Sequence, residues 1–133
     1  MRRSNLSLLL VVFSLMGSVA FALEPSPVDI TCSQGEDCIK VLVLKAGGQP
    51  MNLSGYTYRA QIRTTPADIQ PLAEIPIDVS ALTTGTVLLA LPGALTNQLG
   101  GKVAYWDLRQ TDPSGRVSYP MRGKFKCYWA ITR

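Results

Sequence analysis

The stretch GYTYRAQIRT (residues 55–64) alternates between apolar and polar side chains with a period of two. One side carries Tyr56, Tyr58, Ala60 and Ile62, and the other carries Thr57, Arg59, Gln61 and Arg63. This period is that of a β-strand with one face buried and the other facing water. The stretch KVAYWDLRQT (102–111) alternates in the same way. The two stretches therefore predict half-buried strands that place Ile62, Trp106 and Leu108 in the core.

Further short strands are predicted on both sides of these two. Runs rich in apolar and β-branched residues, bounded by turn residues, occur at 28–33, 38–45, 72–80, 85–92 and 116–133. The run 38–45 is too apolar for a strand with one solvent-exposed face, so we expect a central, mostly buried strand there. We expect its Leu42 and Leu44 to face Trp106 and Leu108 from the opposite sheet.

Prolines and glycines punctuate these runs. Pro76 lies inside 72–80 and cannot donate a ladder hydrogen bond, which predicts an edge strand or a break. Pro120 marks a bulge or break in the last strand or pair of strands, and Asp-Pro-Ser-Gly (112–115) predicts a hairpin turn. GALTNQLGG (93–101) fits one helical turn or a loop. About seven short strands with no long helix after residue 22 predict an all-β protein, an antiparallel β-sandwich over 23–133.

The first 22 residues, MRRSNLSLLLVVFSLMGSVAFA, have the character of an export signal. Two arginines precede an apolar run, and Ala20-Phe21-Ala22 fits the small-x-small pattern that signal peptidase cleaves. The alternatives are an uncleaved apolar helix at a membrane or interface and a buried helix of a protein that is not exported. Contact with a membrane is expected only through residues 1–22, if they are retained.

Export would place the three cysteines in an oxidising compartment, where one internal bridge leaves one thiol over. Cys32 ends the first strand and Cys38 begins the second, so their spacing suits a bridge across the turn between them. A bridge from Cys127 to either of them is the rival. We expect the Cys32–Cys38 pair, with Cys127 as a buried free thiol.

The composition argues against enzymatic activity and against a cofactor. The chain has no histidine, which removes the commonest general base and metal ligand, and three cysteines cannot make a four-cysteine zinc site. Asp107 is interpreted as the outward residue of an alternating strand, and Glu74 is one of several carboxylates scattered over loops and strand ends, so no acid pair is evident. Asp29, Glu36 and Asp37 lack the dense loop of a calcium site, and Gly47-Gly48 and Gly100-Gly101 are interpreted as turns.

Two groups of side chains are candidates for binding. The basic residues Arg122, Lys124, Lys126 and Arg133 gather near the C-terminal end, too sparsely for a nucleic-acid footprint, so we expect a solvated strand face. The aromatic residues Tyr105, Trp106, Tyr128 and Trp129 would suit either a carbohydrate-stacking surface or the packing of a small sandwich. Alternation places Trp106 inside and Tyr105 outside.

The order of several motifs resembles a known family. DITCSQG (29–35), VLVLKAGGQPMNLSGYTYRAQIR (41–63), VLLALP (87–92) and YWDLRQTDPSGRV (105–117) follow one another along the chain. This set resembles the small Ig-like structural domain of tailed phages, represented by the N-terminal domain of the siphophage baseplate upper protein. The resemblance covers nearly all of residues 28–133.

The resemblance implies an Ig-like β-sandwich that serves as a non-enzymatic virion protein. It implies attachment to other virion subunits in a homo-oligomer or hetero-assembly, in the tail, baseplate or capsid, without specific nucleic acid binding. On the family register, Cys38 and Cys127 belong to facing sheets. The signal-like segment and the cysteines depart from the family pattern, which leaves a second hypothesis: an exported periplasmic or secreted binding module.

Overall fold

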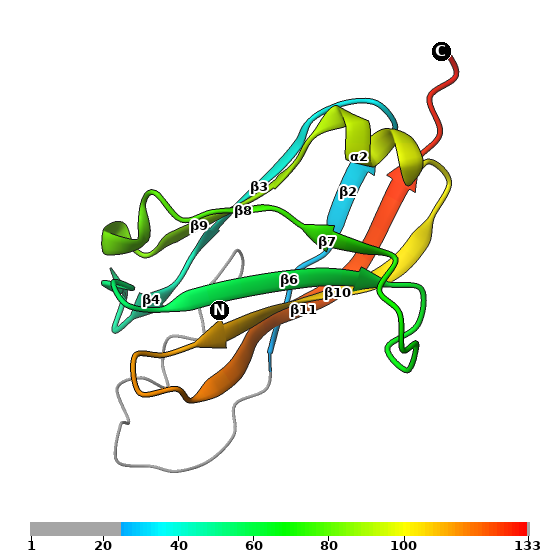
Figure 1. Cartoon of the computed structure of the whole chain (residues 1–133). Coiled ribbons are helices and arrows are strands. Elements are labelled where there is room, and N and C mark those ends of the chain that lie inside the picture. The colour runs from blue at the N-terminus through cyan, green and yellow to red at the C-terminus, as the bar shows by residue number, and fades with distance from the viewer. Residues whose placement is uncertain (1–24, 133) are drawn as a thin grey trace.

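The computed structural model describes residues 25–132, so the expected signal cleavage after Ala22 and its helical alternatives lie outside the described part. Figure 1 shows the strands arranged as two facing layers. The strands are β1 (Ser26–Pro27), β2 (Ile30–Ser33), β3 (Cys38–Val43), β4 (Lys45–Ala46), β5 (Gln49–Pro50), β6 (Thr57–Arg63), β7 (Ala73–Ile75), β8 (Ile77–Asp78), β9 (Thr86–Leu91), β10 (Val103–Thr111) and β11 (Val117–Tyr128). A 3-10 turn, η1 (Leu82–Thr84), and the helix α2 (Gly93–Gln98) complete the fold.

The larger sheet runs in the order β1-β11-β10-β6-β7, and β2 also pairs with β11. The smaller sheet runs in the order β3-β9-β8, and β4 and β5 form a separate short hairpin. This order is that of an immunoglobulin sandwich, in which strands B, E and D form one sheet and G, F, C and C′ form the other. The chain is therefore an Ig-like, all-β sandwich.

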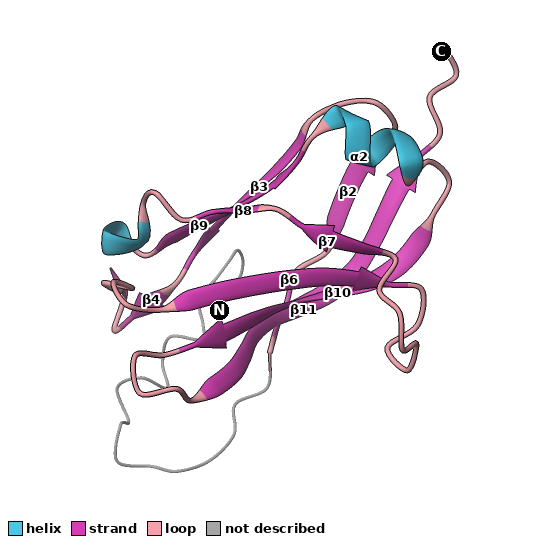
Figure 2. Cartoon of the chain, viewed as in Figure 1, coloured by secondary structure: helices cyan, strands magenta, loops and turns pink. Residues whose placement is uncertain are grey.

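Helical structure is confined to short segments at the ends of the strands (Figure 2). The segment 93–101 begins with the helix α2, so the helical alternative holds there. Within residues 25–132, no helix is long and apolar enough to cross a membrane.

The core lies between the two sheets and contains the expected side chains. Ile62, Trp106 and Leu108 from the larger sheet are at most 3% exposed, as are Leu42 and Leu44 on the opposite side. Phe125 of β11 is completely buried beside them. The alternation of β6 and β10 thus places their apolar sides against the smaller sheet.

The prolines act at two different points of the sandwich. Pro76 separates β7 from β8, and these strands belong to different sheets, so the chain crosses from one layer to the other at this residue. The final segment is one continuous strand, β11, rather than a pair. Its register with β10 shifts between Leu108 and Gln110, opposite Pro120, as expected for a bulge that accommodates a residue without an N–H.

The prediction of a central, mostly buried strand at 38–45 was wrong. β3 pairs only with β9 and forms an edge of the smaller sheet. Its outward side chains Ile39 and Val41 are 60% and 56% exposed. The reason is that β1 and β2 pair in parallel with β11 instead of extending the smaller sheet. The sandwich is therefore antiparallel except at this point.

Two side-chain hydrogen bonds add to the strand pairing that holds the first strands against the larger sheet. The Trp106 indole Nε1–H donates a hydrogen bond of 2.7 Å to the carbonyl oxygen of Val28, and the Lys124 N–H donates one of 2.9 Å to Asp29. Gly123 makes the approach possible, because a Cβ at this position would overlap the Val28 carbonyl group. These interactions, rather than the local sequence, leave β3 at an edge.

Candidate functional site

The three cysteines meet at one end of the sandwich. A disulfide joins Cys32 on β2 to Cys38 on β3, with their Cα atoms 5.6 Å apart, and so ties the larger sheet to the smaller one. Cys127 is a free thiol that is 1% exposed and lies in register with Cys32 on the neighbouring strand β11. Burial raises the pKa of the Cys127 thiol, which favours its protonated, unreactive form.

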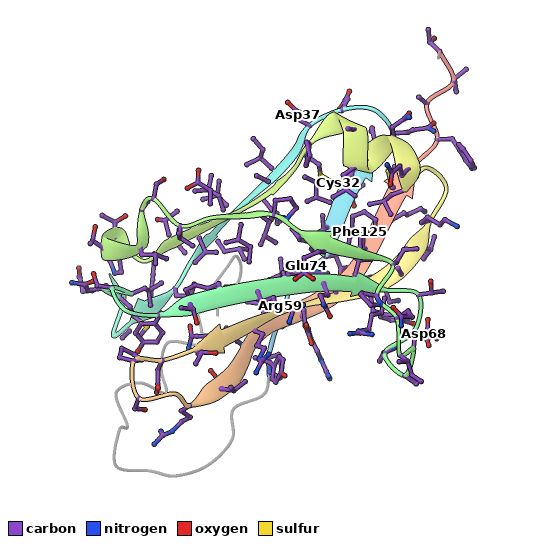
Figure 3. All side chains as sticks on the ribbon, viewed as in Figure 1. Cys32, Asp37, Arg59, Asp68, Glu74 and Phe125 are labelled. Carbon is purple, nitrogen blue, oxygen red and sulfur yellow. A yellow bond between two sulfur atoms is a disulfide. The ribbon has the colours of Figure 1, made fainter. Side chains whose placement is uncertain are left out.

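Asp107 and Glu74 lie on the outer face of the larger sheet, on either side of Gln61. Glu74 accepts hydrogen bonds from Arg59 Nε at 2.8 Å and from Gln61 Nε2 at 3.0 Å, and Figure 3 shows Arg59 and Glu74 side by side. The hydrogen bond from Arg59 lowers the pKa of Glu74. Partial burial raises the pKa of Asp107, although the positive charges of Arg63 on β6 and Arg122 on β11 oppose this shift. Glu74 is thus occupied by structural partners.

The other carboxylates act as backbone acceptors. Asp37 accepts a hydrogen bond of 2.8 Å from the N–H of Gly93, at the start of α2 (Figure 3). Asp112 accepts hydrogen bonds from the N–H groups of Ser114 and Arg116 in the β10–β11 turn. In the part of the chain that the structure describes, no three His, Cys, Asp or Glu side chains lie close enough to hold a metal ion.

The outward side chains of β6, β7, β10 and β11 form a surface that we call the basic face. It carries six cations: Arg59, Arg63, Arg109, Arg122, Lys124 and Lys126. Its carboxylates are Asp107 and Glu74. Between the cations stand Val103, Tyr105 and Tyr128, which are 63%, 43% and 51% exposed. The Lys126 Nζ lies 4.7 Å from the centroid of the Tyr128 ring.

Positive charge is concentrated on this face. The described residues contain ten Lys and Arg side chains and eight Asp and Glu side chains. Six of the cations but only two of the carboxylates lie on the basic face. The other described residues therefore carry more acidic than basic side chains. Arg59–Glu74 is the one salt bridge among residues 25–132. Arg59 and Arg109 also stand directly opposite each other on β6 and β10, an arrangement that costs stability in a sheet.

The outer side of the smaller sheet is aliphatic on β3 and β9, and we call this part the apolar face; the exposed Asp78 on β8 borders it, opposite Leu88. Ile39 and Val41 on β3 lie opposite Ala90 and Leu88 on β9, so the four side chains share one side of the sheet. The sandwich thus exposes two faces of different character, one basic with tyrosines and one aliphatic.

Sequence reasoning found parts of these surfaces. The alternation placed Trp106 inside and Tyr105 outside, and the cluster Arg122, Lys124 and Lys126 was visible along β11. Arg63 and Arg109 were missed as neighbours of that cluster, because only the strand register of β6, β10 and β11 brings them to it. The aliphatic face was missed because 38–45 was expected to be central.

No protein-family model matches the chain, and no curated protein matches it. Among solved structures, the N-terminal domain of phage TP901-1 ORF48 is similar, with 15% identity over 79% of this chain and 90% of that chain and a TM-score of 0.47. Murine CRIg is similar with 12% identity over 77% of this chain and 93% of that chain, at a TM-score of 0.42.

Proposed function

We propose that the chain is a non-enzymatic structural protein of a phage virion, attached to other virion subunits through the exposed faces of its sandwich. Its location would be the tail, baseplate or capsid surface. The motif order at 29–35, 41–63, 87–92 and 105–117 supports the phage assignment, because it resembles that of the Ig-like structural domain of tailed phages. These segments form strands and turns of the sandwich.

The observation that carries the interaction role is the apolar face. Apolar side chains that adjoin one another on a protein surface mark contact surfaces, whereas singly exposed ones do not. Ile39 and Val41 meet this description. The partner chemistry that fits them is an apolar surface patch of another virion subunit.

The absence of a catalytic role is supported by chemistry rather than by comparison. The chain has no histidine, Glu74 is held by Arg59 and Gln61, and the Cys127 thiol is buried. None of these groups is positioned to act as an activated nucleophile or a free general base.

The test is incorporation into particles. We expect an Ile39→Asp/Val41→Asp variant to fold but to be lost from purified virions, because the two carboxylates would have to be desolvated in the contact. Ile69→Asp/Ile131→Asp is the matched control, since these isoleucines are 88% and 97% exposed outside the sheets. Equal incorporation of the two variants would refute the assignment of the apolar face.

A second function is favoured by the disulfide. Structural disulfides persist in oxidising compartments, so the Cys32–Cys38 bridge fits an exported periplasmic or secreted binding module. Cell fractionation with intact-mass measurement separates the two proposals. A periplasmic or secreted form lacking residues 1–22, together with its absence from virions, would favour the exported module.

A further inference from the structure

We propose that the basic face of the larger sheet is a second docking surface, and that its partner is a carboxylate-rich protein surface. This inference deepens the proposed function, because it names the chemistry of one attachment surface. It rests on the concentration of charge described above and on the side chains that stand between the cations.

The cations are arranged as a regular array. Arg122, Lys124 and Lys126 project from alternate positions of β11 and are all exposed. Alternate residues of a strand are about 7 Å apart, and adjacent strands about 4.8 Å. A partner that presents carboxylates at a similar spacing, such as an extended acidic strand or loop, would meet several cations at once.

The cations are available for such a partner. Arg59 is the one cation of the basic face that makes a salt bridge within residues 25–132. Arg63 donates to the backbone carbonyl oxygens of Asp68 and Ile69, which hold its side chain in place, and it makes no salt bridge with the nearby Glu74 and Asp107. Arg109 stands opposite Arg59 and makes no salt bridge within residues 25–132, so a bound carboxylate would supply its counter-charge.

The side chains between the cations favour a protein partner over a nucleic acid. Tyr and Arg are enriched in protein–protein interfaces, and the face also exposes the aliphatic side chain of Val103. Asp107 stands at the centre, directly opposite Arg122 on β11 and Gln61 on β6. The Asp107 carboxylate would repel a phosphate backbone, which carries a negative charge at every nucleotide. A protein surface of mixed composition can place a hydrogen-bond donor against Asp107 and its carboxylates against the cations.

The experiment measures binding of fluorescein-labelled poly-L-glutamate to the folded protein by anisotropy, with single-stranded poly-dT of matched charge as the second probe. The face variant is Lys124→Glu/Lys126→Glu. The control is Lys45→Glu/Arg116→Glu, which changes the net charge equally at residues outside the basic face.

We expect the face variant to bind polyglutamate at least about tenfold more weakly than the wild type, and the control to stay within about threefold. Binding should weaken between low salt and about 0.15 M salt, as for solvent-exposed charges. Equal losses in the two variants would show that only net charge matters and would overturn the proposal. Absence of polyglutamate binding at low salt would also overturn it.

Tighter binding of poly-dT than of polyglutamate would overturn the partner class and assign the face to a phosphate polymer. Both measurements use purified protein, so their failure leaves the virion assignment untouched. Conversely, absence of the protein from virions would refute the proposed function without changing the polymer result.

Discussion

Replacing Trp106 with alanine removes the side chain that joins the core to the first strands. Trp106 is 3% exposed, and its Nε1–H donates a 2.7 Å hydrogen bond to the Val28 carbonyl oxygen. Truncation of a buried tryptophan costs about 3–5 kcal/mol of unfolding free energy. This is a large share of the 5–15 kcal/mol typical of a domain, so we expect the melting temperature to fall by on the order of 15–30 °C.

Trp106→Phe separates packing from hydrogen bonding. Phenylalanine retains most of the apolar contact but leaves the Val28 carbonyl oxygen without its donor, which costs about 1–3 kcal/mol. Val103→Ala is the control, because Val103 lies on the outward side of the same strand and is 63% exposed. This substitution should change the unfolding free energy by less than about 0.5 kcal/mol.

The assay is urea unfolding followed by far-ultraviolet circular dichroism, which does not depend on the fluorescence of the removed indole. A loss of less than about 1 kcal/mol in Trp106→Ala would contradict the assignment of Trp106 to the core. Equal losses in Trp106→Ala and Trp106→Phe would show that ring packing contributes little and that the hydrogen bond dominates.

Three further predictions follow from the fold. Replacing Cys32 and Cys38 by alanine should lower the unfolding free energy by about 2 kcal/mol, the loop-closure value for a sequence separation of 6; an unchanged urea midpoint would contradict this. Gly123→Ala should destabilise the domain and increase amide exchange at Val28, because a Cβ at 123 overlaps the Val28 carbonyl group; native exchange there would contradict the close approach. Burial raises the folded-state pKa of Asp107 above its unfolded value, so the folded state holds the proton more tightly. This effect stabilises the fold at acid pH and is lost as the pH rises through the folded pKa. Asp107→Asn should therefore stabilise the fold at neutral pH by no more than about 1 kcal/mol and have less effect in acid; the reverse order in thermal melts at the two pH values would contradict this.

The sequence predicted those features of the fold that are set by local periodicity. The alternation at 57–63 and 103–111 depends only on which side chains follow one another, and the structure places Ile62, Trp106 and Leu108 on the buried side. The sequence also predicted an edge strand or a break at Pro76, because proline cannot donate a ladder hydrogen bond. The structure shows that the chain crosses from one sheet to the other at this residue.

The features that were missed depend on contacts between distant residues. Whether β3 is central or at an edge depends on where the first strands pair, and this is fixed by Trp106 and Gly123 far along the chain. The basic face likewise requires the register that brings Arg63 of β6 and Arg109 of β10 beside β11. A single sequence shows the charges but not the strand order that collects them.

The most direct test of the virion assignment is mass spectrometry of particles purified from cells that express the gene from its native genome. The proposal predicts peptides from residues 25–132 in those particles, at a constant ratio to the other virion proteins across a density gradient. Recovery of the protein only from the periplasm or the medium, with none in the particle fractions, would contradict it.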